Sequence, residues 1–473
     1  MLKILKYIFI IWLVITVVGA PFYYPYARMV WVFNPMVSQP SYDTPATPTD
    51  ARLQDIDYLR KFTSYDRAFT EDQEASFQQA LDSLEGRAAD LSDAEFYMQI
   101  AKAVGLPDNG HTNLSSRPQN TDFNTLGVRF YEFSDGLYIV EATSDYTHLL
   151  GQRVVSMESR PIEDVFSSLA PFKGGNEAWK RLAGPKLMQS PVLMNAVGLA
   201  EAPDRLTIEV EDADGKRTIE TISAAYAEDP SAVPSRYAYY SLLPGEDDKT
   251  NRTWRHMSDA ANVTPPRYLQ SQDDLLHYDL PGNGYYIRSL GGFVAGDLSI
   301  PKAYNQMTSG LAEASLDYLV VDFRINDGGN YLKSMPFAKR AGSYLKPDGK
   351  LYIVTGSNTF SAGIVTVAML KYYGGEKAQI IGEPIGDFER FWAESGGSFR
   401  LPNSGYYVYY ATGLHDWNKG CKGEPYCFTM NEWHEVPAGS LAPSVNIETT
   451  FVDYAKGKDT VLDWVFAQHQ DAP

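Results

Sequence analysis

The chain is poor in cysteine, in positive charge and in metal-binding motifs, and each shortage excludes a class of protein. Its 473 residues hold two cysteines, and 41 basic residues stand against 59 acidic ones, for a net charge of −18. Nucleic-acid binding needs clustered Lys and Arg, so we expect no nucleic-acid partner and attribute the acidity to solubility. No motif has the spacing of a metal site, and we expect neither a metal nor another cofactor. The sequence also lacks internal repeats and long low-complexity segments.

The two cysteines lie close together, at Cys421 and Cys427 in the segment CKGEPYC. In an exported chain this spacing favours a local disulfide that closes a surface loop. Gly and Pro residues in and around the segment are typical of a loop.

The N-terminus has the pattern of an export signal. Lys3 and Lys6 precede an apolar run over residues 7–18, and a small-residue step VGA follows. One interpretation is a cleaved signal peptide, although Pro21 directly after the step disfavours cleavage. The other is an uncleaved membrane anchor helped by the aromatic residues of 22–33, since the run alone is short of the roughly 20 residues of a full span. Both predict that the body of the protein is extracytoplasmic, periplasmic or secreted.

The rest of the chain divides by pattern into a multidomain α+β protein with an α/β core. Two capping boxes, Thr70 with Gln73 and Ser92 with Glu95, precede helical apolar spacing. Later the pattern changes to short strands with a hairpin at Asp214-Gly215. The predicted segments are a signal or anchor (1–24), a linker (25–50), a helical region with the loop of His111 (51–121), a β-rich module (122–225), an irregular connector (226–283) and an α/β core (284–473).

Two of these segments have more specific patterns. Within the β-rich module, GQRVVSMESRPIEDV resembles the signature of PDZ domains, in which a strand and a turn precede a short helix. In the α/β core, YYIRSL, LDYLVVDFR, KLYIVTG and AQIIGE are apolar, β-branched runs separated by helical stretches. That alternation predicts a mostly parallel sheet covered by helices.

Ser361 follows one of these buried strands and opens a helix, in the segment TFSAG. It has two interpretations. As an N-cap it would accept hydrogen bonds from free N–H groups of the helix. As a nucleophile it would present its hydroxyl at a strand-to-helix turn, beside free N–H groups and the positive end of the helix. Ala362 is small enough for a substrate to approach the backbone.

A second turn, DFRINDGG, ends the preceding buried strand, where open α/β sheets bind their ligands. Gly328 and Gly329 allow backbone N–H groups to face a ligand, and such groups stabilise the oxyanion of acyl transfer. For Asp322 and Arg324 a structural ion pair is the favoured interpretation.

Together these segments resemble the catalytic core of the C-terminal-processing (tail-specific) peptidases and the tricorn core proteases. The matching motifs, in order, are DFRINDGGN, TFSAG, IIGEPIG and SFRLPNSGYYVYY. The order of helical N-terminus, PDZ-like module and α/β core also agrees, over most of the chain from about Asp50 to Phe466. The resemblance implies a crotonase-like (ClpP/crotonase superfamily) core and a serine peptidase that acts on peptides or proteins without a cofactor.

The resemblance also implies which residue acts as the base. Tail-specific enzymes use a lysine shortly after the Gly-Glu-Pro segment, but this chain reads GEPIGDFERF there, and Lys371 and Lys377 lie on the wrong side of the strand. The tricorn-like branch uses a histidine upstream of the PDZ-like module. This chain has His111 at that place, in NGHT, and His415, next to Asp416, is the fallback.

The resemblance further implies an acidic residue, a supporting hydroxyl and a pair of oxyanion donors. Glu394, in FWAESGG, best matches the acidic member of the tricorn-like site, and Glu389 competes with it. The supporting serine of that branch is not evident, since Gly110 precedes the histidine, and Thr112 is the candidate substitute. The oxyanion donors implied by the resemblance are the N–H groups of Gly328 or Gly329 and of Ala362.

We therefore predict an exported serine-type peptidase of the tricorn-like branch, which acts through a Ser361 acyl-enzyme with His111 as general base. The alternative is an inactive relative that binds a peptide or an apolar ligand in the same cleft, as the retinoid-binding proteins of the photoreceptor matrix illustrate. The joint presence of Ser361 and His111 favours the enzyme, since a pure binder need not keep both. The sequence leaves the oligomeric state open.

Overall fold

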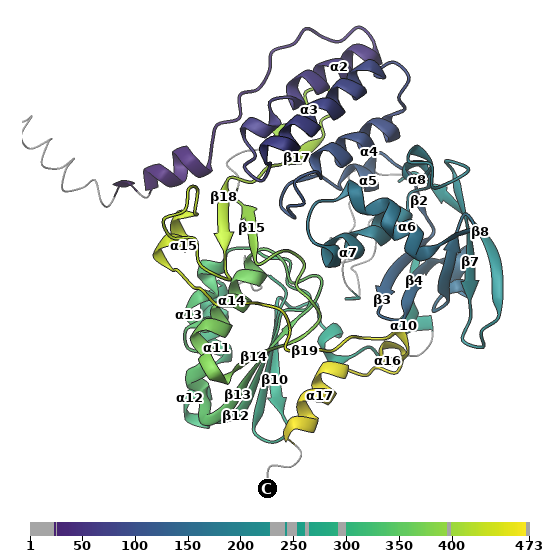
Figure 1. Ribbon diagram of the computed structural model, residues 1–473. Helices are drawn as coiled ribbons and strands as arrows, with labels where there is room; N and C mark the ends of the chain where they lie inside the picture. The colour runs from purple at the N-terminus through teal and green to yellow at the C-terminus, as the bar shows by residue number, and fades with distance from the viewer. Residues whose placement is uncertain are drawn as a thin grey trace, which may run out of the picture.

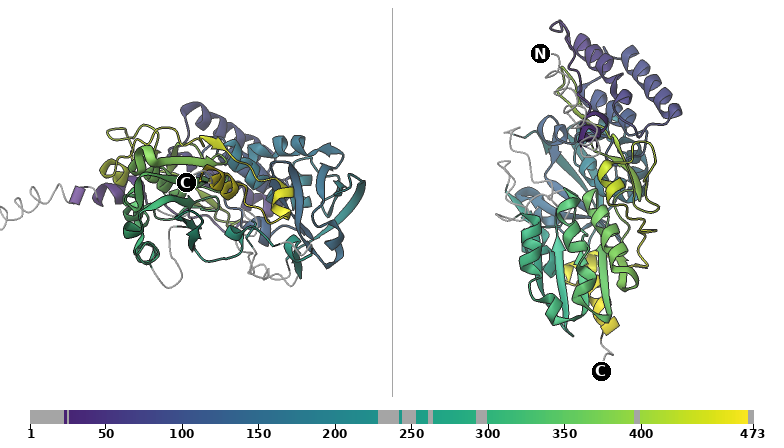
Figure 2. Two further views of the ribbon diagram at one scale, coloured as in Figure 1. Left: turned by 90° about the horizontal axis from the view of Figure 1, so that it is seen from below. Right: turned by 90° about the vertical axis from the view of Figure 1, so that its left-hand side faces the viewer.

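The computed structural model describes residues 23–24, 26–227, 242–243, 253–260, 264–291, 299–394 and 399–469. The predicted signal or anchor falls almost entirely on residues 1–22, which lie outside this part. Among the described residues, no helix combines the length and the apolar character needed to cross a membrane. Figure 1 shows a helical region, a β-rich module and an α/β region, and Figure 2 shows the helical and α/β regions toward opposite ends of the molecule.

The helical region is built as its capping signals predict. Both predicted capping boxes form, at the starts of α3 (Glu71–Gly86) and α4 (Asp93–Val104), and the apolar side chains at helical spacing are buried. One further helix, α2 (Pro48–Leu59), begins inside the stretch predicted as linker. Its start has a local cause, because Thr47 and Asp50 form a third capping box around Pro48 at the first helical position.

The β-rich module is an antiparallel sheet with the strand order β2-β8-β7-β5-β4-β3, and β6 and β9 pair beside it. The predicted hairpin is the pair β7–β8, joined through Asp214-Gly215. Strand β3 lies at the edge of the sheet, with helix α7 packed against it. The elements are β2 (Thr125–Leu126), β3 (Val128–Phe133), β4 (Gly136–Thr143), β5 (Arg153–Met157), β6 (Arg160–Pro161), α6 (Ile162–Leu169), α7 (Glu177–Met188), α8 (Pro191–Ala196), β7 (Arg205–Glu211), β8 (Arg217–Ala225) and β9 (Trp254–His256).

The α/β region is a six-stranded sheet with the order β10-β11-β12-β13-β14-β19. All neighbours are parallel except β10 and β11, a hairpin whose first strand lies in the stretch predicted as irregular connector. Helices α11, α13 and α14 cover one face of the sheet, and α16 and α17 pack on the other (Figure 1). The elements are β10 (Leu275–Leu280), β11 (Gly284–Ser289), α11 (Ile300–Met307), α12 (Leu311–Ala314), β12 (Leu316–Asp322), α13 (Met335–Ala338), β13 (Leu345–Thr355), α14 (Ala362–Gly374), β14 (Ala378–Gly382), β19 (Val445–Asn446), α16 (Phe451–Ala455) and α17 (Thr460–His469).

The chain returns from the α/β region to the helical region before it ends. Strand β17 (Tyr407–Tyr409) pairs with β1 (Asn113–Leu114) and with β16 (Phe399–Arg400). The ring of Phe399 stacks on Tyr58 of α2, with centroids 4.5 Å apart. The buried carboxylate of Asp55 accepts the backbone N–H groups of Asn403 and Ser404. Residues far apart in the sequence therefore form one packed unit, and this unit carries the loop of His111.

Candidate active site

Ser361 has a strained backbone at the junction between strand β13 and helix α14. Its φ is 52° and its ψ is −122°, in a region that L-residues other than glycine rarely occupy. Its side chain makes no capping hydrogen bond to the helix. The structure thus removes the capping interpretation and leaves a half-buried serine with a strained backbone directly before a helix, as at a nucleophile elbow.

The turn after β12 lies directly against Ser361. A Cβ atom added to Gly328 would lie 2.6 Å from Ser361 Cβ and 3.3 Å from the nitrogen of Ala362, so glycine is required for this close approach. The N–H of Gly328 donates to Asn326 Oδ1 at 3.1 Å. Because the N–H of Gly328 is occupied, the predicted oxyanion donors that remain are the N–H groups of Gly329 and Ala362. The N–H of Ala362 lies in the first turn of α14, where helical N–H groups have no partner within the helix.

The loop that carries His111 is fixed at both ends. The Asn109 side chain donates to the carbonyl of Trp392 at 3.0 Å and accepts its N–H at 2.9 Å, which ties the loop to strand β15 (Arg390–Ala393). The Thr112 hydroxyl donates to the buried carboxylate of Asp66 at 2.7 Å. Thr112 is thereby committed to Asp66 and does not support the His111 ring.

The imidazole of His111 lies between two phenylalanine rings. Its centroid is 4.5 Å from that of Phe360, the residue before Ser361, and 5.2 Å from that of Phe391 on β15. The stack continues from Phe360 to Trp179 of α7, at 4.3 Å, and from Phe391 to His415, at 4.9 Å. The fold therefore brings His111 next to the nucleophile segment, although in the described part of the chain no hydrogen bond joins Ser361 Oγ to the ring.

Asp387 is the carboxylate next to His111. Its Oδ2 lies 3.4 Å from Nδ1 of the ring, its side chain is fully buried, and its Oδ1 accepts the N–H of Phe388. Within the described residues Oδ2 and both ring nitrogens lack hydrogen-bond partners. Gly110 makes room for this contact, since a Cβ there would lie 2.5 Å from Asp387 Oδ2.

Sequence reasoning did not find Asp387. The available signal was its place directly after GEPIG, the stretch in which the lysine of a Ser–Lys dyad was sought and found absent. The identity of Gly110, read as a missing serine, is explained by the same contact.

The structure places the two predicted glutamates away from His111. Glu394 Oε1 lies 3.4 Å from Nε2 of His415, whose pKa is lowered by burial. The carboxylate of Glu389 accepts hydrogen bonds from Asn418, Ser440 and the N–H of Leu441.

Two structural predictions are confirmed near the site. Cys421 and Cys427 form a disulfide, with Cα atoms 5.5 Å apart. Asp322 and Arg324 form an ion pair at 2.6 Å, and Arg324 also binds Asp459 at 3.0 Å. Among the described residues, no group of three or more His, Cys, Asp or Glu side chains could hold a metal.

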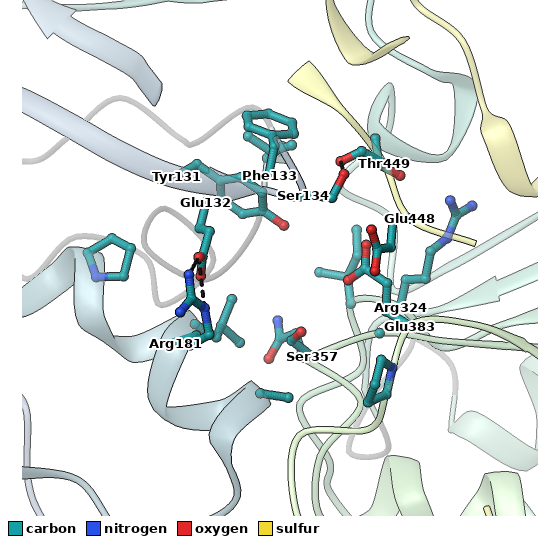
Figure 3. A pocket seen from close by; sticks show the side chains of 18 of the residues that line it. Tyr131, Glu132, Phe133, Ser134, Arg181, Arg324, Ser357, Glu383, Glu448 and Thr449 are labelled. Carbon is teal, nitrogen blue, oxygen red and sulfur yellow. Dashed lines mark hydrogen bonds and ion pairs between the residues drawn. The ribbon is translucent and has the colours of Figure 1, made fainter. Parts of the chain in front are cut away.

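A pocket of about 560 Å³ lies between the β-rich module and the α/β region and is lined by residues of both. Figure 3 shows Glu132 and Arg181 paired on the module side, facing Glu383 and Arg324 across the opening. Burial raises the pKa of both Glu132 and Glu383. The wall of the α/β region includes residues 356–358, which belong to the loop that leads from β13 to Ser361.

Comparison with known proteins supports the fold. No protein-family model and no curated protein matches the chain. Mature CPAF complexed with lactacystin is similar in structure, with a TM-score of 0.55 and 13% identity over 88% of this chain and 97% of that chain. Mature CPAF alone gives the same TM-score and identity over 88% and 96%.

The photosystem II D1 C-terminal processing protease matches 87% of this chain and 98% of its own, at a TM-score of 0.37 and 12% identity. At 13% identity, the likeness to CPAF shows the fold alone. The agreement with CPAF extends over most of both chains.

Proposed function

We propose that the protein is an exported serine-type peptidase that hydrolyses peptide bonds through an acyl-enzyme on Ser361. The observation that carries the proposal is the backbone of Ser361, which is strained without any capping role for the side chain. Backbone strain of this kind costs about 1–3 kcal/mol and is retained mainly at functional sites. A fold shared with CPAF and the adjacent imidazole of His111 support it.

His111 is the general base in this mechanism. It accepts the hydroxyl proton as Ser361 Oγ attacks the scissile carbonyl, and it returns that proton to the leaving amine. Water then attacks the acyl-enzyme by the same route. The N–H groups of Gly329 and Ala362 stabilise the oxyanion, since that of Gly328 is already bound to Asn326.

Asp387, rather than the predicted Glu394, orients the imidazole. A buried carboxylate beside Nδ1 holds the proton on that nitrogen and leaves Nε2 free to accept the proton of the serine. Glu394 contacts His415 instead. The ring of His111 must shift within its aromatic stack to reach Ser361 Oγ, and substrate binding is expected to draw the two together, because catalytic hydrogen bonds tighten in the substrate complex.

The β-rich module is the substrate-binding part in this proposal, as a PDZ-like domain beside a crotonase-like core. Strand β3 is an edge strand whose residues 131–133 line the pocket, so an extended peptide can add to the sheet there. Such a peptide leads toward residues 356–358 and Ser361. Peptide or protein chains are therefore the proposed substrates.

The second candidate is a catalytically inactive relative that binds a peptide or an apolar ligand. It is favoured by the absence of a hydrogen bond between Ser361 Oγ and His111 in the described part of the chain, and by the size of the pocket. Hydrolysis of a mixed library of internally quenched peptides separates the two. We expect cleavage by the wild type and none by Ser361→Ala at equal concentration. Equal cleavage by both would refute Ser361 as nucleophile, and no cleavage by either would favour the binder.

A further inference from the structure

The first described residues expose an unusual number of large apolar side chains. Tyr23, Tyr24 and Tyr26 are between 63% and 67% exposed, and Trp31 is 80% exposed. Most of these residues lie in a short helical segment that ends at Phe33, whose ring is fully buried against Phe428 at 5.2 Å. The segment is thus attached to the body of the protein at its C-terminal end while its aromatic side chains face outward.

The segment is also held along its length. Arg28 binds Glu432 at 2.6 Å and donates to the carbonyl of Cys427 at 3.2 Å. Figure 1 shows the segment beside helix α15 (Thr429–Trp433). The next residue after Glu432 is Trp433, which is 49% exposed. We call Tyr23, Tyr24, Tyr26, Trp31 and Trp433 together the aromatic surface; it combines the first described residues with a part of the chain some 400 residues later.

The charge of the N-terminal part of this surface favours a lipid partner. No acidic residue precedes Asp43, in a chain that contains 59 of them. The charged residues in that stretch are Lys3, Lys6 and Arg28, and the charge of Arg28 is offset by Glu432. Tyrosine and tryptophan favour the boundary between lipid and water, where the ring is apolar and its polar end is hydrated. An apolar run over residues 7–18 directly precedes the surface in the sequence.

We propose that the aromatic surface lies in the headgroup region of a lipid bilayer. The segment is short and has aromatic side chains on one side, so we expect it to lie in the plane of the interface and not to cross the bilayer. Because Trp433 belongs to the folded body, the contact would fix the orientation of the whole molecule relative to the membrane. The proposal is independent of the peptidase chemistry, since no residue of the aromatic surface belongs to the candidate active site.

Fluorescence quenching in vesicles tests this surface. The full-length protein is reconstituted into phosphatidylcholine–phosphatidylglycerol vesicles that contain brominated lipids, and tryptophan quenching is compared among three variants. Trp31→Phe and Trp433→Phe should each remove part of the quenching, because each removes a tryptophan at the interface. Trp464→Phe is the control, since Trp464 lies on α17, distant from the N-terminal segment in Figure 1, and should remove none.

Two results would overturn the proposal. If Trp433→Phe leaves the quenching unchanged, the folded body does not touch the bilayer, and only the N-terminal part of the chain contacts lipid. If instead the wild type self-associates with rising concentration in the absence of lipid, and the double variant Trp31→Ser/Trp433→Ser does not, the surface belongs to a second copy of the chain.

Discussion

At the scale of single residues, the candidate site depends on close approaches that tolerate no added atoms. Gly328 lies against Ser361, and Gly110 lies against Asp387, at distances that exclude a Cβ atom in either glycine. The first contact lies at the strained backbone of Ser361, and the second admits a carboxylate beside His111. The geometry of the candidate site therefore depends on these two glycines as much as on its functional side chains.

The role of Asp387 predicts a sharp difference between two acidic residues. Asp387→Asn should lower kcat by about 10⁴-fold if it acts as the buried carboxylate of a catalytic triad does. Glu394→Gln should leave kcat near the wild-type value, because Glu394 contacts His415 and not His111. Steady-state peptide hydrolysis with both variants, and a circular dichroism spectrum to confirm folding, checks this. The reverse order of effects would restore Glu394 as the acidic member.

Local patterns in the sequence were enough to predict the elements that carry the nucleophile, but not those that surround it. The capping boxes of α3 and α4, the buried strands and the position of Ser361 depend on neighbours in the sequence. Asp387 has one local signal, its place directly after GEPIG, and only the fold brings it beside His111, which lies 276 positions earlier in the sequence. Its role could not be predicted because it is defined by a contact between distant segments.

At the scale of elements, helix α7 of the β-rich module contacts the residues of the candidate active site. Its N-cap, Asn176, donates to the carbonyls of Ile385 and Asp387, both at 2.9 Å, and accepts the N–H of Trp179. Trp179 in turn stacks on Phe360. The same helix also lines the pocket, so one element contacts the proposed substrate path, the segment before Ser361 and the backbone of Asp387.

Removal of the α7 cap should therefore lower kcat as well as the free energy of unfolding. Asn176→Ala loses the cap, worth about 1 kcal/mol, and also frees the loop of Asp387. Thr70→Ala is the matched control, because it removes the cap of α3, which packs against α2 and α4 of the helical region. We expect similar losses in the free energy of unfolding, and a fall in kcat for Asn176→Ala alone. Equal kcat values in the two variants would contradict a positioning role for α7.

At the scale of the whole molecule, distant parts of the chain meet at one buried carboxylate. Asp66 accepts hydrogen bonds from Thr112 of the His111 loop, from the N–H of Ala411 in the returning C-terminal segment, and from the N–H of Ala68. Burial raises the pKa of Asp66 to about 6. This contact joins the predicted helical region to the predicted α/β core, and it also holds the loop of His111.

This raised pKa predicts a stability change with a definite sign. The folded state binds the proton of Asp66 more tightly than the unfolded state, so the stabilisation is full below pH 4 and is lost as the pH rises through 6. Relative to Asp66→Asn, which does not titrate, the wild type should lose up to about 3 kcal/mol between pH 4 and pH 7. Urea unfolding of both proteins across this range measures the difference. A difference independent of pH would show that Asp66 is ionised throughout.

The central claim is that a nucleophile from the α/β region and a base from the helical region form one active site. Its most direct test is covalent labelling with a fluorophosphonate, followed by peptide mass mapping, on the wild type, Ser361→Ala and His111→Ala. We predict one adduct, on Ser361, in the wild type, no adduct in Ser361→Ala and a strongly slowed reaction in His111→Ala. Labelling of Ser361→Ala at the wild-type rate, or an adduct on any other residue, would contradict the account.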